Sequence, residues 1–358
     1  MSRYSRHIIL SEVGPQGQAL LSSAKVLVIG AGGLGCPVLQ YLAAAGIGTL
    51  GIIDFDVVEL SNLQRQILFG TSSIGMNKAL AAKNRLEDLN PTIQMNAYPE
   101  KLTAKNVLTL FDRYDIIVDG SDNFATRYLV NDASIITDKP VVFGAIYKFE
   151  GQVSVFNYLN GPSYRCLFPT PPKEGSVANC SEVGVLGVLP GIIGSMQANE
   201  VIKMILGFEH VLTGKLLCYN SKTADITTIK VKKSEKEFEK VHALKDQLID
   251  QYPESICEIN VEDISAEDAL NKENVQFIDV REQDEYPQID IPPNLQIPLD
   301  ILEQNLNRLP PEKEYIIFCQ SGVRSKLAVQ LLKELDIQHC YSLRGGALAI
   351  VEHLKIKT

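Results

Sequence analysis

Short apolar runs alternate with amphipathic stretches along the first part of the chain. Residues 25–29 and 49–56 begin with β-branched and aliphatic side chains typical of buried strands, whereas residues 36–47 and 77–90 repeat apolar positions at a helical spacing. The alternation continues with a strand at 93–98, a strand at 114–123 that ends in a polar loop, a helix at 127–137 and a strand at 140–146. Strands that alternate with helices predict an α/β fold with a doubly wound, mostly parallel sheet.

The pattern changes after residue 150, and this change sets the expected domain boundaries. Residues 151–158 and 215–232 have the pattern of hairpin strands around one long apolar helix near 192–206, which predicts an antiparallel extension and a first domain over residues 1–230. A charged stretch follows, and we predict a partly helical linker over residues 231–256. Further strand-like runs alternate with amphipathic stretches and predict a small α/β domain over residues 257–358.

Charge and composition argue against several classes of function. The 358 residues carry a formal net charge of -9, and the basic run at 230–233 is followed at once by glutamates, which argues against nucleic acid as a partner. The longest apolar segment, 183–206, contains glycines, Pro190, Glu200 and Lys203, so we expect no membrane span. The seven cysteines lack paired spacing and the N-terminus lacks an apolar signal sequence, which favours free thiols in the cytoplasm.

A glycine turn joins the first predicted strand to the first long helix. Gly30, Gly32 and Gly35 form the pattern G-x-G-x-x-G, and Asp54 ends the next strand, where an acidic side chain can accept hydrogen bonds from ribose hydroxyls. This combination indicates a nucleotide site at a helix N-terminus. Two other interpretations stay open at this point: glycines that serve only helix–sheet packing, and a dinucleotide dehydrogenase.

Polar residues that follow successive strands favour polyphosphate chemistry over hydride transfer. Arg65 and Lys78 can neutralise phosphates, Asn62 can donate hydrogen bonds to them, and Asp122 can hold Mg²⁺. The chain contains no G-x-x-x-x-G-K-[ST] sequence, so cleavage at the α-phosphate is the more natural reaction. A binding module whose nucleotide site has lost its activity is the alternative from another class.

The segments RYSRHIIL, GAGGLGCP, DFDVVELSNLQRQ, GSDN and NCSEVGVLG together resemble the adenylyltransferases of molybdopterin-synthase activation and the thiamine pathway, relatives of ubiquitin-activating enzymes. The resemblance covers residues 1–230 and implies a Rossmann-like domain that acts as a homodimer, with Arg6 reaching the ATP of the neighbouring protomer. It also implies a set of residues that bind ATP and its magnesium: Gly33, Asp54, Ser61, Asn62, Leu63, Gln64, Arg65, Lys78, Asp122 and Asn123.

The resemblance also bears on Cys180 and on a structural metal. Cys180 lies in SVANCSEVGVLG; a single cysteine is more often inert packing, but the family match implies a thiol that forms a thioester or an acyl disulfide with the carrier. The family usually carries two C-x-x-C pairs for zinc. Here the first pair reads SYRC, with Ser163 in place of a ligand and Cys166 remaining, and residues 231–240 contain no cysteine or histidine. We therefore predict no zinc site.

Cys319 ends a predicted strand, and a glycine-bearing loop leads from it through Arg324 into a helix. Loop N–H groups and the helix N-terminus would stabilise a thiolate or persulfide there. The pattern C-x-x-G-x-R-S, preceded by DVRE with Glu285 and Tyr286, resembles the rhodanese sulfurtransferase domain over residues 257–358, although QIDIPPNLQ departs from the usual sequence of the intervening loop. A buried strand-end thiol and a phosphatase-like relative are the alternatives. The remaining cysteines are interpreted as buried packing: Cys36, Cys218, Cys257 and Cys340.

Taken together, the two halves imply one enzyme, a nucleotidyltransferase with a sulfurtransferase domain. We expect it to adenylate the C-terminal glycine of a ubiquitin-like sulfur carrier of the molybdopterin-synthase small-subunit type, with ATP and Mg²⁺. Sulfur transfer through Cys319 would then form a thiocarboxylate. A thiamine-pathway carrier is the alternative substrate, and a persulfide donor such as a cysteine desulfurase is the expected partner.

Overall fold

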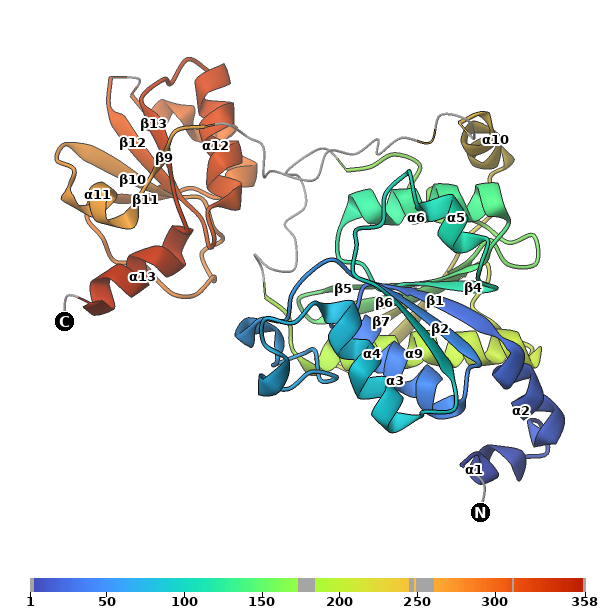
Figure 1. The fold of residues 1–358 in the computed structure, drawn as a ribbon. Helices are drawn as coiled ribbons and strands as arrows, with labels where there is room; N and C mark the ends of the chain where they lie inside the picture. The colour runs from blue at the N-terminus through green and yellow to red at the C-terminus, as the bar shows by residue number, and fades with distance from the viewer. Residues whose placement is uncertain (1–2, 173–183, 245–247, 249–260, 311, 357–358) are drawn as a thin grey trace. The chain divides into compact units, whose positions relative to one another are not determined.

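The computed structural model describes residues 3–172, 184–244, 248, 261–310 and 312–356. It forms two compact units, the first containing described residues up to 171 and from 185 to 248, and the second containing residues 261–356 (Figure 1). Cys180 and Cys257 lie outside the described residues. Among the described residues, no helix is both long enough and apolar enough to cross a membrane.

The first unit is built on an eight-stranded sheet in the order β3-β2-β1-β4-β5-β6-β7-β8. The strands from β3 to β5 pair in parallel, and those from β5 to β8 pair antiparallel. The predicted doubly wound sheet with an antiparallel extension is therefore confirmed. Its strands are β1 (Lys25–Ile29), β2 (Thr49–Ile53), β3 (Gln94–Tyr98), β4 (Ile116–Asp119), β5 (Val141–Tyr147), β6 (Glu150–Phe156), β7 (Lys215–Asn220) and β8 (Ile226–Lys230).

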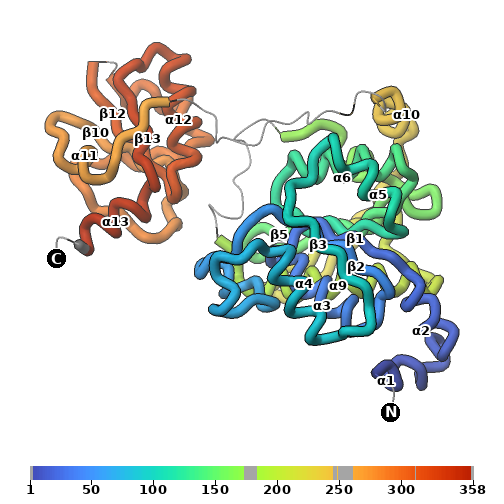
Figure 2. Tube along the Cα trace, in the orientation of Figure 1, coloured from blue at the N-terminus to red at the C-terminus, as the bar shows by residue number. Residues whose placement is uncertain are grey.

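Helices cover both faces of this sheet (Figure 1). One face packs against α3 (Gly35–Ala45), α4 (Lys78–Leu89) and α9 (Val188–Leu206), and the other packs against α5 (Val107–Phe111) and α6 (Phe124–Thr137). Two helices lead into β1 at one end of the unit, α1 (Ser5–Ile8) and α2 (Gly14–Ser23) (Figure 2). The short elements are η1 (Leu60–Asn62), η2 (Thr71–Ser73) and α7 (Tyr164–Leu167).

Two helices differ from the sequence prediction. Helix α9 begins at Val188 rather than near 192, because Pro190 falls in its first turn, where no intrahelical N–H is needed. Within the charged segment predicted as a linker, α10 (Glu235–Ala243) is amphipathic and packs against α6 of the first unit. This segment therefore contributes a helix to the first unit.

The second unit has a five-stranded parallel sheet in the order β11-β10-β12-β13-β9. Its central strand, β12, has one apolar cluster on each face, and one of them includes residues of α12. The elements are β9 (Asp263–Ile264), α11 (Ala266–Asn271), β10 (Val275–Asp279), β11 (Asn294–Gln296), η4 (Leu299–Ile301), η5 (Glu303–Arg308), β12 (Glu314–Phe318), α12 (Val323–Glu334), β13 (Cys340–Leu343) and α13 (Gly346–Ile356).

Candidate active sites

The glycine turn lies where the strand order of the large sheet reverses, between β1 and β4. Gly30 has a φ of +87°, and its amide donates to the Ile53 carbonyl at 2.9 Å. A Cβ at Gly35 would collide with the Gly30 carbonyl oxygen, so glycine is required for the helix α3 to begin this close to β1. Because ligands of such sheets bind at this reversal, outside the carboxyl ends of the strands, the turn defines a candidate nucleotide site.

Asp54 follows β2 and holds the glycine turn from the side. Its carboxylate accepts the Ala31 amide at 2.7 Å and the Asp56 amide at 2.9 Å. Burial raises the pKa of Asp54, and the Ala31 hydrogen bond and the Lys78 charge oppose this rise. A carboxylate has further lone pairs, so Asp54 remains able to accept ribose hydroxyls.

The segment after β2 brings two cations toward the turn. The Arg65 side chain passes over Gly33, and its Nη1 donates to the Ser61 carbonyl at 3.1 Å. Lys78, the first residue of α4, is buried and pairs with Asp56 at 3.0 Å. These are the positive charges that a polyphosphate at the glycine turn would meet.

Other predicted residues of this segment are used in its own structure. The Asn62 Oδ1 accepts the Glu59 amide at 3.1 Å as part of a capping box, and Ser61 Oγ donates to Glu59 at 3.2 Å. Leu63 packs against the core, and Gln64 lies against Gly187. In this structure Arg65 alone of the 61–65 run lies beside the glycine turn, and the others shape the loop that carries it.

The SDN loop follows β4 on the other side of the reversal. Asp119 is buried and accepts both the amide and the hydroxyl of Ser121, at 2.9 and 2.6 Å. Burial raises the pKa of Asp119, and the Arg127 charge opposes it. This turn leaves Asp122 exposed, while Asn123 caps α6 by accepting the Thr126 amide at 2.8 Å. The Asp122 carboxylate is therefore available for a cation.

Two buried amides near the turn were not predicted as site residues. Gln197 of α9 is fully buried and donates to the carbonyls of Asp119 and Val142 at 2.8 and 3.2 Å, which fixes the end of β4. Gln66 is 3% exposed, its Nε2 lies beside Gly32, and its Oε1 has no hydrogen-bond partner among the described residues. No sequence signal singled out Gln197, because α9 also contains Asn199, Glu200 and Lys203; for Gln66 the signal was the second glutamine of QRQ.

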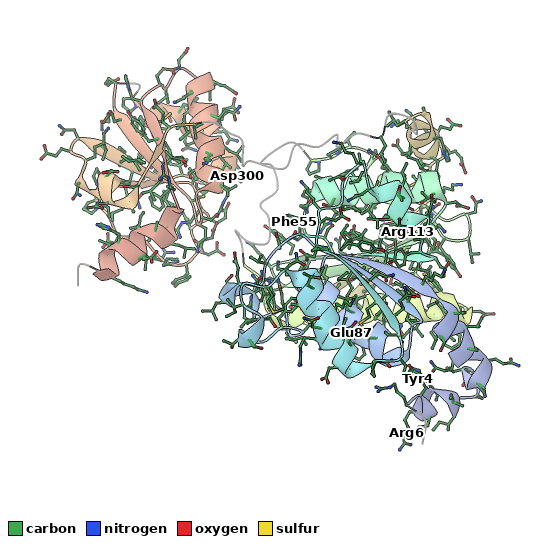
Figure 3. All side chains as sticks on the ribbon, viewed as in Figure 1. Tyr4, Arg6, Phe55, Glu87, Arg113 and Asp300 are labelled. Atoms are coloured by element: carbon green, nitrogen blue, oxygen red, sulfur yellow. The ribbon has the colours of Figure 1, made fainter. Side chains whose placement is uncertain are left out.

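Arg6 lies far from the glycine turn of its own chain. The helix α1 is anchored by the Tyr4 hydroxyl, which interacts with Asn90 and Thr92 at 2.9 and 3.2 Å and approaches Gly46 at the C-terminal end of α3. The glycine turn is at the other end of α3, about 16 Å away for a helix of this length. Figure 3 shows exposed Arg6 well away from Phe55, which follows Asp54.

The cysteines of the first unit differ in their environments. Cys36 is fully buried, and burial raises the pKa of its thiol to about 12. Cys218 on β7 is only partly buried, so its interpretation as a buried packing residue was wrong. Partial burial raises the pKa of its thiol, and the negative charge of Glu150 raises it further. Cys180, the thiol expected to react with the carrier, lies outside the described residues.

In the second unit, Cys319 directly follows the central strand β12. Its Sγ is fully buried and accepts the Gly322 amide at 3.2 Å. Gly322 has a φ of +98° and is the N-cap residue of α12. Its amide, at the N-terminus of this helix, is therefore the group that contacts the Cys319 sulfur. The Cys319 carbonyl accepts the Ala347 amide at 2.7 Å, which fixes the loop to α13.

The arginines around this loop are paired. Arg324 forms two hydrogen bonds of 2.7 Å with Glu285, and Arg281 binds Asp279 and also donates to Gln320 at 3.1 Å. Burial acts to raise the pKa of Glu285, but the hydrogen bonds from Arg324 and the Glu282 amide outweigh it, and the pKa is lowered. Tyr286 is exposed beside this pair. These pairs hold the thiol loop in place without a bound ligand.

The geometry of the two units defines a class of protein. The first unit offers a glycine turn, cations and an exposed carboxylate at a sheet reversal, which suits activation by a nucleotide. The second offers a thiol held by loop amides at the end of a parallel strand, which suits transfer chemistry at sulfur. The molecule is therefore a nucleotide-activating α/β enzyme with a thiol domain of its own.

Comparison with known proteins narrows the class to a family. The ThiF family matches residues 4–241 and the rhodanese-like domain matches residues 264–353. The chain belongs to the ThiF family and carries a C-terminal rhodanese-like domain; it is an adenylyltransferase with a sulfurtransferase domain. This confirms the resemblance of both halves to the two families.

Relatives with the same two-domain organisation span nearly the whole chain. The probable adenylyltransferase/sulfurtransferase MoeZ of Mycobacterium tuberculosis is 39% identical over 99% of this chain and 94% of its own. The adenylyltransferase and sulfurtransferase MOCS3 of Xenopus laevis is 38% identical over 98% of this chain and 86% of its own. The sulfur carrier protein adenylyltransferase of Thermus thermophilus is 51% identical over 65% of this chain and 88% of its own. A crystal structure of E. coli MccB shares the fold, with a TM-score of 0.59 at 24% identity, over 65% of this chain and 72% of that one.

Proposed function

We propose that the enzyme uses ATP to adenylate the C-terminal glycine carboxylate of a ubiquitin-like sulfur-carrier protein of the molybdopterin-synthase small-subunit type. A carboxylate oxygen of the carrier attacks the α-phosphorus, the bond to the β-phosphate breaks, and pyrophosphate leaves. The observation that carries the proposal is the position of Arg65 beside Gly33 at the sheet reversal, where the exposed carboxylate of Asp122 follows the neighbouring strand β4. The printed name of the Thermus thermophilus relative, a sulfur carrier protein adenylyltransferase, supports the class of substrate.

The residues of the site fit a magnesium nucleotide. Asp122 is an exposed carboxylate at the carboxyl end of a strand, the kind of ligand that Mg²⁺ prefers beside phosphate oxygens. Bound Mg²⁺ would neutralise charge on the polyphosphate. The chain itself contributes Arg65 and Lys78 as counter-charges, Asp54 for the ribose, and Gly33 for close approach of the backbone. Asn123 would support the site as the cap of α6.

We further propose that the rhodanese-like domain supplies the sulfur. A persulfide on Cys319, received from a persulfide donor such as a cysteine desulfurase, would attack the acyl carbon through its terminal sulfur, and AMP would leave. A second thiolate, for which Cys180 is our candidate, would attack the Cys319 sulfur, so that the bond to the acyl-bearing sulfur breaks, the thiocarboxylate leaves and a Cys180–Cys319 disulfide forms. A cellular dithiol reductant would then return both cysteines to thiols. All described cysteines are free, which supports a reducing compartment such as the cytoplasm.

The position of Arg6 supports a homodimer with composite sites. Arg6 is exposed at the far end of α3 from its own glycine turn, so it cannot neutralise phosphate there. We propose that it reaches the ATP of a second protomer. A symmetric pair would then have two equivalent sites, each completed by the partner.

The decisive experiment is ATP–pyrophosphate exchange with purified carriers. We expect exchange to depend on a molybdopterin-type carrier, to be lost in Asp122→Ala, and to persist in Cys319→Ala, which should lose thiocarboxylate formation only. A thiamine-pathway carrier that alone stimulates exchange would replace the proposed substrate. Exchange with neither carrier would refute the adenylation proposal.

A further inference from the structure

One cluster in the first unit has no part in either candidate active site, and it contains the positions at which the resemblance to the adenylyltransferases implies a structural zinc. Its first part is Ser163-x-x-Cys166 at the start of α7, and its second is Ser234-x-x-Glu237 at the start of α10. Each part has the spacing of a C-x-x-C pair. Two chain segments far apart in sequence therefore meet at positions that match the two halves of a four-ligand site.

The side chains of this cluster do not fit zinc. Structural zinc takes four thiolate or imidazole ligands, and here a single thiol stands with two serine hydroxyls and one carboxylate. The Glu237 Oε1 already accepts the Lys240 ammonium group at 2.7 Å. Among the described residues, no group of three or more His, Cys, Asp or Glu side chains could hold a metal ion.

The sulfur of Cys166 makes the contacts that join the two segments. It accepts the Ser163 amide at 3.3 Å and the Ser234 amide at 3.3 Å, and it lies 3.5 Å from the Ser163 hydroxyl. Both amides belong to helix N-cap residues, Ser163 for α7 and Ser234 for α10. In a capping box, the side chain at the third helical position accepts the backbone N–H of the N-cap residue. At α10 the Cys166 sulfur accepts this N–H, and the Ser234 side chain makes no capping hydrogen bond.

We propose that Cys166 replaces the metal as a hydrogen-bonded clamp. Its thiol ties the N-terminus of α10 to α7 and so holds α10 on the outer face of α6. The adjacent residues extend the clamp into α6: Arg165 pairs with Asp132 at 2.6 Å, and the Tyr164 ring lies edge-on to Tyr128 with the centroids 5.3 Å apart. Because α6 begins at the SDN loop, the clamp stabilises the base on which that loop is built. The inference concerns structure and does not depend on the proposed substrate.

The inference predicts that cysteines at the other three positions would rebuild a zinc site. We expect the variant Ser163→Cys/Ser234→Cys/Glu237→Cys to bind about one zinc ion per chain and to show a tetrahedral thiolate spectrum with Co²⁺. The matched control is Ser163→Cys/Lys233→Cys/Lys236→Cys, which keeps the number and spacing of cysteines but moves the second pair by one residue. Position 236 then points about 100° away from position 237 around α10, and position 233 lies before the N-cap of the helix. This control should bind none. Equal zinc uptake by the two variants, or none by the first, would refute the shared geometry.

The natural chain gives the second part of the test. The purified protein should contain no zinc, and its thermal midpoint should not change with chelator. Cys166→Ala should lower the midpoint by about 2–4 °C through loss of the two amide bonds, whereas Cys218→Ala should leave it unchanged. Zinc at about one ion per chain, or equal midpoints for the two alanine variants, would overturn the proposal.

Discussion

The two active sites occupy the same place in their sheets but are completed in different ways. Both lie at the carboxyl ends of parallel strands, where a glycine turn leads into a helix. The candidate nucleotide site draws Asp54, Arg65 and Lys78 from the segment between β2 and the first residue of α4, and Asp122 from the loop after β4. At the thiol site the sulfur and the amide that contacts it belong to one loop, but the partners that hold this loop come from the segment after β10 and from α13. The contact at the sulfur is local, whereas the support of both sites spans long sequence distances.

The charges of the two sites also differ. Beside Cys319 the arginines are already neutralised, Arg324 by Glu285 and Arg281 by Asp279. At the glycine turn, Asp122 is exposed and Gln66 keeps a buried oxygen without a partner among the described residues. The candidate nucleotide site thus keeps an exposed carboxylate and a buried amide oxygen for a ligand to contact, although its Lys78 is paired with Asp56, whereas both arginines beside the thiol loop are paired.

The largest effect that would separate the two sites is expected from Arg65→Ala. Loss of this cation should lower ATP–pyrophosphate exchange by about 10²–10³-fold, because it removes charge stabilisation from the reacting phosphate. Persulfide loading of Cys319 should be unchanged, and Arg85→Ala, an exposed cation on α4, should affect neither assay. If both assays fell equally in Arg65→Ala, the sites would not be independent.

An intermediate effect is expected from Glu285→Gln, which breaks the charge pair beside Cys319. It should destabilise the second unit by about 2 kcal/mol, because Arg324 is left buried beside a neutral amide. Hydrogen exchange of amides in β12, followed by mass spectrometry, would measure the loss, with Glu267→Gln as an exposed control. The ATP–pyrophosphate exchange catalysed by the first unit should not change.

The same pair predicts a pH dependence with a definite sign. Burial acts to raise the pKa of Glu285, but the hydrogen bonds from Arg324 outweigh burial and hold this pKa below its ordinary value. The stabilisation is therefore complete above the unfolded pKa, about 4.3, and is lost as the pH falls through the lower folded pKa. Glu285→Gln should remove this acid dependence from β12. A difference between the two proteins that is as large at pH 3 as at pH 7 would contradict this account.

Much of the fold followed from local patterns, and the exceptions have physical causes. The strands β1, β2, β4 and β5 are buried runs bounded by glycine or polar turns, so their assignment as strands and their order along the chain were predictable. The short strands β9 and β11 have two and three residues, too few for a periodic pattern. The amphipathic stretch that precedes β12 forms the short helices η4 and η5, with non-helical dihedral angles at Asn305, and this break has no counterpart in the spacing of its apolar residues.

The sites show the same limit more sharply. Cys319 and Arg324 were predictable because both belong to one short loop and the start of the helix that follows it, although the partner of Arg324, Glu285, lies 39 residues away. Asp119, Gln66 and Gln197 were missed because their roles depend on which segments meet at the sheet reversal, and no local spacing reports that. Asn62 was assigned to phosphate from its residue type and from the resemblance, and Asn123 from the resemblance alone. In the structure the Oδ1 atoms of their side chains accept backbone N–H groups at the starts of η1 and α6, and their assignment to ATP stays a prediction.

The smallest expected signal is a partial recovery of activity on mixing two variants, and it tests whether the nucleotide site needs a second chain. Arg6→Ala and Asp122→Ala should each be inactive in exchange. Mixed and re-equilibrated in equal amounts, they should recover about a quarter of the natural rate, because half the dimers are mixed and each mixed dimer has one intact composite site. Arg3→Ala, which changes a neighbouring arginine that binds the Leu89 carbonyl, is the matched control and should keep its activity unmixed. Persulfide loading of Cys319 should stay at the natural level throughout, since the Gly322 amide and the Arg324–Glu285 pair already hold the thiol loop within one chain. No recovery on mixing would place Arg6 outside the active site and make the nucleotide site as self-contained as the thiol site.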